Sequence, residues 1–211
     1  REREVNEILA NIDLKLAARV AQNLGLAAPK KGTVDVTPQS LKQSPALSQM
    51  NLLGEGIKGR KVAILVADGV DAVQVDALVK ALDAESAQAK LLGPTSAPVT
   101  SADGKTLAVD ASMEGMPSVA FDAVFVPGGA ASIKALSANG VALHYVLEAY
   151  KHLKAIALHG EAKQLQDLLK LEADAGLLQG KDVPALTKPF FAAIGQHRVW
   201  DREPKAKAIP A

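Results

Sequence analysis

The sequence predicts an α/β protein in which helices cover both faces of a parallel, doubly wound sheet. From residue 61 onward, short apolar runs alternate with segments of helical periodicity. The runs at residues 62–67 and 120–126 are apolar almost throughout, which is typical of strands buried on both faces. Glycine and proline turns at Gly93-Pro94 and Pro127-Gly128-Gly129 follow predicted strands directly. Together these three observations favour a single α/β domain over residues 60–211.

Two short amphipathic helices are predicted before this domain, within residues 1–26. Val5, Ile8 and Ile12 recur at helical spacing, and Asp13 is a suitable N-cap for a second helix that Gly25 ends. Residues 27–59 contain several prolines and glycines without sustained periodicity, but they keep scattered apolar side chains. We therefore expect an extended linker over residues 27–59 that lies along another protein surface.

The elements of the domain follow in order. Strands are predicted at residues 62–67, 89–92, 120–126 and 155–158, with a short edge strand at 106–109. Helices are predicted at residues 71–84, 142–153, 161–169 and 183–196. The first strand, the first helix and the second strand make one βαβ unit.

Composition excludes several classes of function. The 211 residues carry 24 basic and 23 acidic side chains, a formal net charge of +1, so no field of one sign could gather nucleic acid or anionic lipid. Aromatic residues make up only 3%, which also argues against base stacking. The absence of cysteine removes disulfides, thiolate metal sites and cysteine nucleophiles. No apolar stretch approaches the roughly 20 residues of a membrane span, and we expect a cytoplasmic protein.

Ligands in open α/β sheets bind beyond the carboxyl ends of the strands. The segments that could form a ligand site are therefore residues 68–74, 127–131 and 158–161, which we expect to lie close together. The glycine turn at 127–129 could admit a phosphate at the next helix, but it lacks the G-x-G-x-x-G spacing and is more simply a tight turn.

Outside that crevice, three further features allow alternatives. His144, Glu148 and His152 are four residues apart on one predicted helix, which is metal-site spacing, but a solvated helix face with Glu148 supporting His152 is the simpler interpretation. Trp200 could either anchor an interface or seal its own domain. Lys205 and Lys207 are interpreted as a solvated tail.

The segment Ala155-Ile156-Ala157-Leu158-His159-Gly160 resembles the elbow of the PfpI-type, class I glutamine-amidotransferase-like superfamily, which implies a flavodoxin-like fold. The resemblance places Leu158 at the position of the family's nucleophilic cysteine, His159 at its neighbouring histidine and Gln74 at its carboxylate. A leucine cannot attack a substrate, and a glutamine cannot exchange a proton near neutral pH. We therefore predict a vestigial pocket of Gln74, Gly128, Gly129, Leu158, His159 and Glu161, with no catalytic, cofactor-binding or metal-binding residue.

Three segments narrow the resemblance to one family. Residues 148–158, the tail from His197 to Trp200 with the closing Ile209-Pro210-Ala211, and the opening at Ile12-Asp13 followed by residues 17–26 are similar to the C-terminal region of large-subunit, clade 2 haem catalases. The resemblance implies that a haem core precedes this chain, that the opening helices end that core, and that the linker runs over it. It also implies a homotetrameric parent whose core and neighbouring subunits are the partners of this domain.

The haem chemistry of that family is not expected in this chain. The family binds haem through a tyrosinate in an R-x-x-x-Y context, and neither Tyr145 nor Tyr150 has an arginine four residues earlier. Peroxide dismutation is therefore assigned to the parent protein, and this chain is expected to be a structural, stabilising or chaperone-like domain that could also bind unfolded proteins. The alternative is a stand-alone PfpI-type hydrolase or glyoxalase that uses His159 and Glu161.

Overall fold

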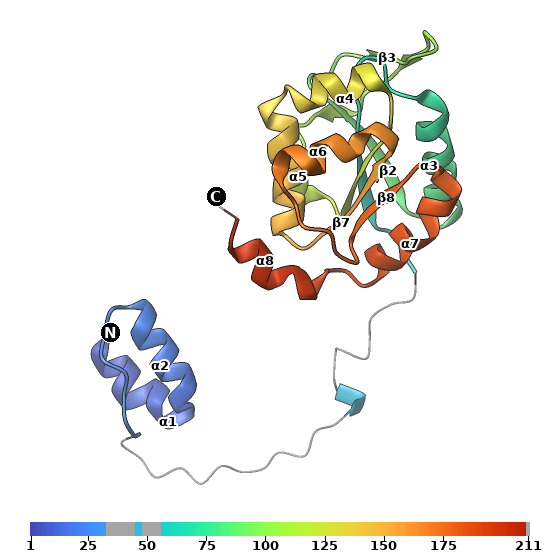
Figure 1. Cartoon of the computed structure of the whole chain (residues 1–211). Coiled ribbons are helices and arrows are strands. Elements are labelled where there is room, and N and C mark those ends of the chain that lie inside the picture. The colour runs from blue at the N-terminus through green and yellow to red at the C-terminus, as the bar shows by residue number, and fades with distance from the viewer. Residues whose placement is uncertain (33–44, 48–55, 210–211) are drawn as a thin grey trace. The chain divides into compact units, whose positions relative to one another are not determined.

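The computed structural model describes residues 1–32, 45–47 and 56–209, and its internal contacts divide the chain into two units, Arg1–Asn51 and Leu52–Ala211. The first unit holds the two predicted helices (Figure 1). One runs through a helical segment, Glu4–Leu9, into α1 (Ala10–Ile12), and the other is α2 (Leu14–Asn23). Asp13 caps α2 as predicted, because its carboxylate accepts the amide of Leu16 at 2.9 Å. Most of the predicted linker, residues 33–44 and 48–55, lies outside the described residues.

The second unit is built on a parallel sheet of six strands in the order β5-β2-β1-β6-β7-β8. Strand β1 lies inside the sheet between β2 and β6, so the chain winds outward in both directions from the first strand. The strands are β1 (Lys61–Leu65), β2 (Gln88–Gly93), β5 (Ala111–Ser112), β6 (Ala123–Val126), β7 (Ala155–His159) and β8 (Leu177–Gly180). This confirms the predicted doubly wound α/β class and is consistent with a flavodoxin-like fold.

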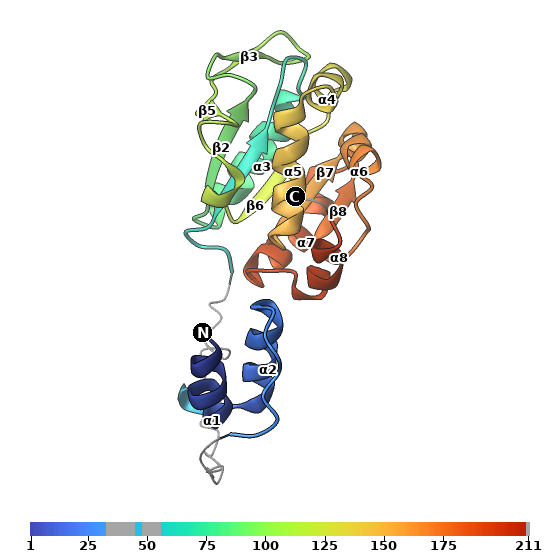
Figure 2. The same ribbon diagram turned by 90° about the vertical axis from the view of Figure 1, so that its left-hand side faces the viewer.

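Helices cover both faces of the sheet (Figures 1 and 2). On one face lie α4 (Ala130–Ser137), α5 (Gly140–Lys151) and α6 (Lys163–Leu169), and on the other lie α3 (Ala72–Ala84) and α7 (Val183–Gly195). Successive residues of a strand point to opposite faces, so Ile64 joins the core under α3 and α7 while Leu65 joins the core under α4 to α6. The strands are apolar at successive positions because helices cover both faces of the sheet.

Several elements differ from the predictions. The short strand predicted at 106–109 is present as β4 (Thr106–Leu107), but it pairs antiparallel with β3 (Val99–Thr100) in a separate hairpin, and β5 lies at that edge of the main sheet. Strand β8 was not predicted, because the sequence Leu-Leu-Gln-Gly is short and half polar. The tail is not simply solvated, since residues Glu203–Lys207 form α8, whose Ala206 is buried.

Candidate functional site

The carboxyl ends of β1, β6 and β7 bring together the residues predicted for the crevice. Gln74, in the first turn of α3, lies against the turn after β6, where its Oε1 accepts the amide of Gly128 at 2.6 Å. Its Nε2 donates to Oδ2 of Asp71 at 2.8 Å, and Asp71 in turn caps α3 through the amide of Val73. Hydrogen bonds at both Nε2 and Oε1 therefore hold the Gln74 side chain in place, and the amide of Gly128 is already bonded to it.

Glu161 occupies the second donor of the same turn. Its Oε2 accepts the amide of Gly129 at 3.4 Å, at the N-terminus of α4. Hydrogen bonds from its own backbone amide and from that of Gly129 lower the pKa of Glu161, and the nearby His159 adds to this effect. A Cβ at Gly128 would lie 2.8 Å from Oε2 of Glu161 and 3.2 Å from the amide of Gln74, so a side chain here would have to displace the ends of both of these side chains.

The resemblance places Leu158 at a reactive position, but the structure turns its side chain elsewhere. Leu158 is fully buried in β7, on the core side that faces α4 to α6. The residue with left-handed backbone is Gly160, at a φ of 55°, and a Cβ there would meet no atom within 4 Å. The sharp turn thus comes two residues later than Leu158, as in a strand-to-helix elbow that carries no side chain.

His159 is 6% exposed, and its Nδ1 is buried without a partner among the described residues. Of the predicted pocket, the structure therefore brings Gln74, Gly128, Gly129 and Glu161 together through hydrogen bonds. His159 lies next to them without a hydrogen bond, and Leu158 lies in the core. The Pro127-Gly128-Gly129 turn has both of its glycine amides engaged by these side chains, which leaves neither free for a phosphate.

The helix face considered for a metal behaves as a paired surface. Nε2 of His152 lies 3.2 Å from Oε2 of Glu148, which confirms the predicted helical pairing, and Lys151 lies 3.7 Å from the same carboxylate. Among the residues that the structure describes, no three histidine, aspartate or glutamate side chains are grouped so that they could hold a metal ion. His144 lies at the same groove as His152, and no contact joins the two rings.

The C-terminal segment is anchored by an arginine that sequence analysis missed. Arg202 is fully buried, and it donates through Nε and Nη2 to the carboxylate of Asp174 at 2.7 and 2.8 Å. Its Nη1 donates to the carbonyl of Lys154 at 2.7 Å, and its guanidinium lies 4.2 Å from the ring centre of Tyr150. Burial alone would raise the pKa of Asp174, but the hydrogen bonds and charge of Arg202 outweigh it and lower that pKa.

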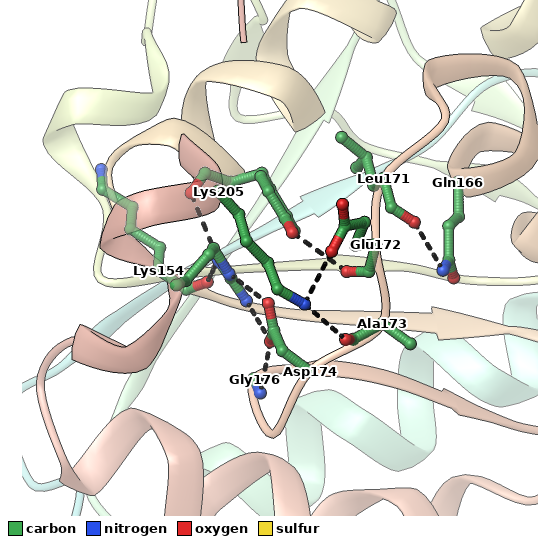
Figure 3. A network of polar contacts seen from close by, with 10 residues as sticks. Lys154, Gln166, Leu171, Glu172, Ala173, Asp174, Gly176 and Lys205 are labelled. Atoms are coloured by element: carbon green, nitrogen blue, oxygen red, sulfur yellow. Dashed lines mark hydrogen bonds and ion pairs between the residues drawn. The ribbon is translucent and has the colours of Figure 1, made fainter. Parts of the chain in front are cut away.

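Figure 3 shows how the tail meets this network. The ammonium of Lys205 lies 2.9 Å from a carboxylate oxygen of Glu172 and 3.4 Å from the carbonyl of Ala173. Lys205, interpreted as part of a solvated tail, thus pairs with the loop before β8 while its side chain remains 38% exposed. Lys207 remains exposed and pairs with Glu203 within α8 at 2.8 Å.

Lys154 is a second buried cation. It is 2% exposed, and its Nζ donates to the carbonyl of Ser118. Burial, helped by the charge of Arg198, lowers the pKa of Lys154 to about 8, against the opposing effect of Asp122 and Glu148. Nothing in the local sequence separates this lysine from the exposed ones, because its burial results from the packing of the segment around Ser118 over the end of α5.

Among the described residues, no helix is both long and apolar enough to cross a membrane. The fold and the turn after β6 first define a class: this is a doubly wound α/β domain in which the side chains of Gln74 and Glu161 are bonded to the glycine amides of that turn. Residues 58–204 match the model of the C-terminal domain found in long catalases. The chain belongs to that family.

Relatives with similar sequences along the whole chain agree with this assignment. The chain is 61% identical over 212 residues to Catalase HPII of Pseudomonas putida and 54% identical over 213 residues to Catalase HPII of Pseudomonas aeruginosa. It is also 41% identical over 212 residues to Catalase-B of Dictyostelium discoideum. All of this chain is covered in each comparison, against 29%, 29% and 31% of the relatives. The chain therefore spans about three tenths of the length of the curated relatives it matches.

Proposed function

We propose that this chain is a non-catalytic domain of a haem catalase and that it stabilises the parent protein by packing against it. In this proposal the haem and the dismutation of hydrogen peroxide belong to a core outside the 211 residues. That core and the neighbouring subunits of a homotetramer are the partners of this chain. The domain boundaries predicted from the sequence, at residues 26 and 59, separate the core-associated helices, the linker and the α/β domain.

The observation that carries the proposal is that side chains of this domain already bond to the two glycine amides of the turn after β6. The amides of Gly128 and Gly129, which would stabilise a developing negative charge, are bonded to Gln74 and Glu161. A substrate would have to displace both side chains. The elbow itself presents Gly160, which has no side chain, and Leu158 beside it is buried. The crevice therefore lacks both a nucleophile and free donors to assist one.

The helical unit supports the packing part of the proposal. Val5, Ala10, Ala17 and Ala21 form its small core, whereas large apolar side chains on its outside remain in contact with water. These exposed side chains are Ile8, Ile12, Leu14, Leu16 and Leu24, with exposed fractions between 42% and 70%. Several large apolar side chains exposed on one small unit are typical of a site of association. We assign this face to the core that precedes the chain in the relatives.

The test compares heat inactivation of the full-length, haem-loaded parent with that of a form that ends after residue 26. We expect equal peroxide dismutation at low temperature and a markedly shorter half-life of the truncated form at high temperature. Equal half-lives would refute the stabilising role. In the full-length protein, Ile12→Asp should also shorten the half-life, because it places a charge on the packing face, whereas Asn23→Asp on the same unit serves as the matched control.

The same proteins can test a chaperone-like role, in which the domain shields apolar surfaces of unfolded proteins. A client enzyme heated with the full-length protein should aggregate more slowly than with the truncated form. A competing hydrolase or glyoxalase function predicts turnover of a small carbonyl or peptide substrate by the purified chain. Such turnover, if lost in His159→Ala, would overturn the non-catalytic assignment.

A further inference from the structure

Trp200 is the only tryptophan of the chain, and 62% of its side chain is exposed. It therefore does not seal its own domain, which was one of the two roles considered for it. A large aromatic side chain held in water is unfavourable, and exposed tryptophans are enriched at the centres of protein interfaces. Its exposure is informative if contacts of the neighbouring residues hold Trp200 in this position.

The fold holds Trp200 from both sides. Two residues further on, Arg202 is fully buried and bonded to Asp174 and to the carbonyl of Lys154. One residue earlier, the amide of Val199 donates to the carbonyl of Leu153 at 2.8 Å. The backbone at Trp200 is thus held by contacts on either side of it. A residue whose backbone is already fixed loses less conformational entropy when a partner covers it.

Trp200 borders a groove of about 440 Å³ between the end of α5 and α8. The floor of the groove is apolar, because Leu153 and Ala206 line it and are each less than a tenth exposed. Leu153 has a φ of 59°, a left-handed conformation that is unfavourable for a leucine at the end of a helix and that glycine usually adopts. A leucine therefore stands at a backbone position that favours glycine, and its side chain lines the groove.

The rim of the groove is basic. Lys151, Arg198 and Lys207 line it, against the single carboxylate of Glu203. Glu203 is engaged by Lys207 at 2.8 Å. Arg198 forms no ion pair with any carboxylate of the described residues. Its Nη1 donates to the neighbouring carbonyl of His197 at 2.7 Å and lies 3.4 Å from Nδ1 of the same residue. The groove therefore offers at least one guanidinium without a counter-ion beside an apolar floor.

We propose that this groove binds an acidic polypeptide segment of a partner protein, with an apolar side chain packed on Trp200 and a carboxylate paired with Arg198. A guanidinium recognises a carboxylate through two parallel hydrogen bonds, and the apolar floor fits a side chain rather than a bare anion. A nucleic acid is not favoured, because one aromatic residue makes no stacking platform and the net charge is only +1.

The fluorescence of Trp200 reports binding directly, because the chain has no other tryptophan. The 211-residue chain is titrated with a short peptide of alternating glutamate and leucine. The comparison ligands are a peptide of alternating lysine and leucine and inorganic tripolyphosphate. We expect a saturable blue shift with the glutamate peptide only, and an affinity that falls as salt is added. Equal or tighter binding of either comparison ligand would overturn the proposal.

Two variants test the groove residues through the anisotropy of a labelled glutamate peptide. Arg198→Glu should weaken binding at least about 10-fold, and Trp200→Ala should weaken it to a similar extent. Lys181→Glu makes the same change of charge at an exposed position outside the groove and should change affinity less than about 2-fold. Circular dichroism establishes that each variant is folded. Unchanged affinity in folded Arg198→Glu would refute the proposed site.

Discussion

Replacing Lys154 with methionine should remove a rise in stability that the wild-type chain shows between about pH 7.5 and 9.5. The buried ammonium of Lys154 has only the carbonyl of Ser118 as a partner, and burial lowers its pKa from 10.5 to about 8. The folded state therefore releases this proton at a lower pH than the unfolded state does. Because the unfolded chain binds more protons between the two pKa values, the free energy of unfolding increases with pH in that range.

The magnitude follows from the two pKa values. Each unit of pH over which the unfolded state holds one extra proton contributes about 1.4 kcal/mol. Integrating the two titration curves gives an increase of about 2 kcal/mol from pH 7.5 to 9.5 for Lys154 alone. The range ends there because burial raises the pKa of Tyr145, which is an acid. Its contribution has the opposite sign and lowers stability above about pH 10.

The assay is urea unfolding followed by circular dichroism at several pH values across this range, on wild type, Lys154→Met and Lys80→Met. Lys80 is an exposed lysine on α3, so its variant should follow the wild-type curve. The difference in unfolding free energy between wild type and Lys154→Met should change by about 2 kcal/mol with pH. If the two curves run parallel, Lys154 is not titrating in a buried environment and the assignment fails.

Three further outcomes are expected. Arg202→Met leaves the carboxylate of Asp174 without its buried partner and should lower the unfolding free energy by about 3–5 kcal/mol, whereas Lys205→Met removes an exposed pair and should have a much smaller effect in the same urea titration. Gly129→Ala should destabilise by more than about 2 kcal/mol, because a Cβ at φ 117° would lie 2.3 Å from the carbonyl oxygen of Gly69, while Gly140→Ala has open space and should be neutral by thermal unfolding. The chain has no native cysteine, so a single introduced cysteine can be followed by its reaction with iodoacetamide, measured by mass spectrometry. Gly160→Cys should react in the folded state, whereas Leu158→Cys should react only on unfolding. The reverse order would place the elbow at residue 158.

Much of the fold could be predicted because the apolar pattern is strong where strands are buried on both faces. The strands around Ile64 and Val124 and the helix that follows the first strand were predicted from pattern alone. The elements that escaped prediction, β5, β8 and α4, have at most eight residues each. Short elements are stabilised by their neighbours in the sheet, and local sequence contains little of that information.

The crevice was predicted in outline and differs in detail. Gln74 and Glu161 were expected near the glycine turn, but sequence spacing could not show that they bond to the amides of Gly128 and Gly129. The motif match could not show that the left-handed turn falls at Gly160 or that Leu158 is buried in the core, because a motif fixes order along the chain and not the residue at which a strand turns. The buried cations Arg202 and Lys154 were missed, since their partners lie between 28 and 52 residues away in sequence.

The contacts of Arg202 also determine how the end of the domain comes apart. Tyr150 and Lys154 lie together at the end of α5, Asp174 lies before β8, and one guanidinium joins both stretches of chain to the tail. The segment that enters the last helix therefore cannot detach while that guanidinium stays in place. Amide hydrogen exchange around Arg202 should follow global opening of the domain, and a protease should not cleave there until the α/β unit has opened.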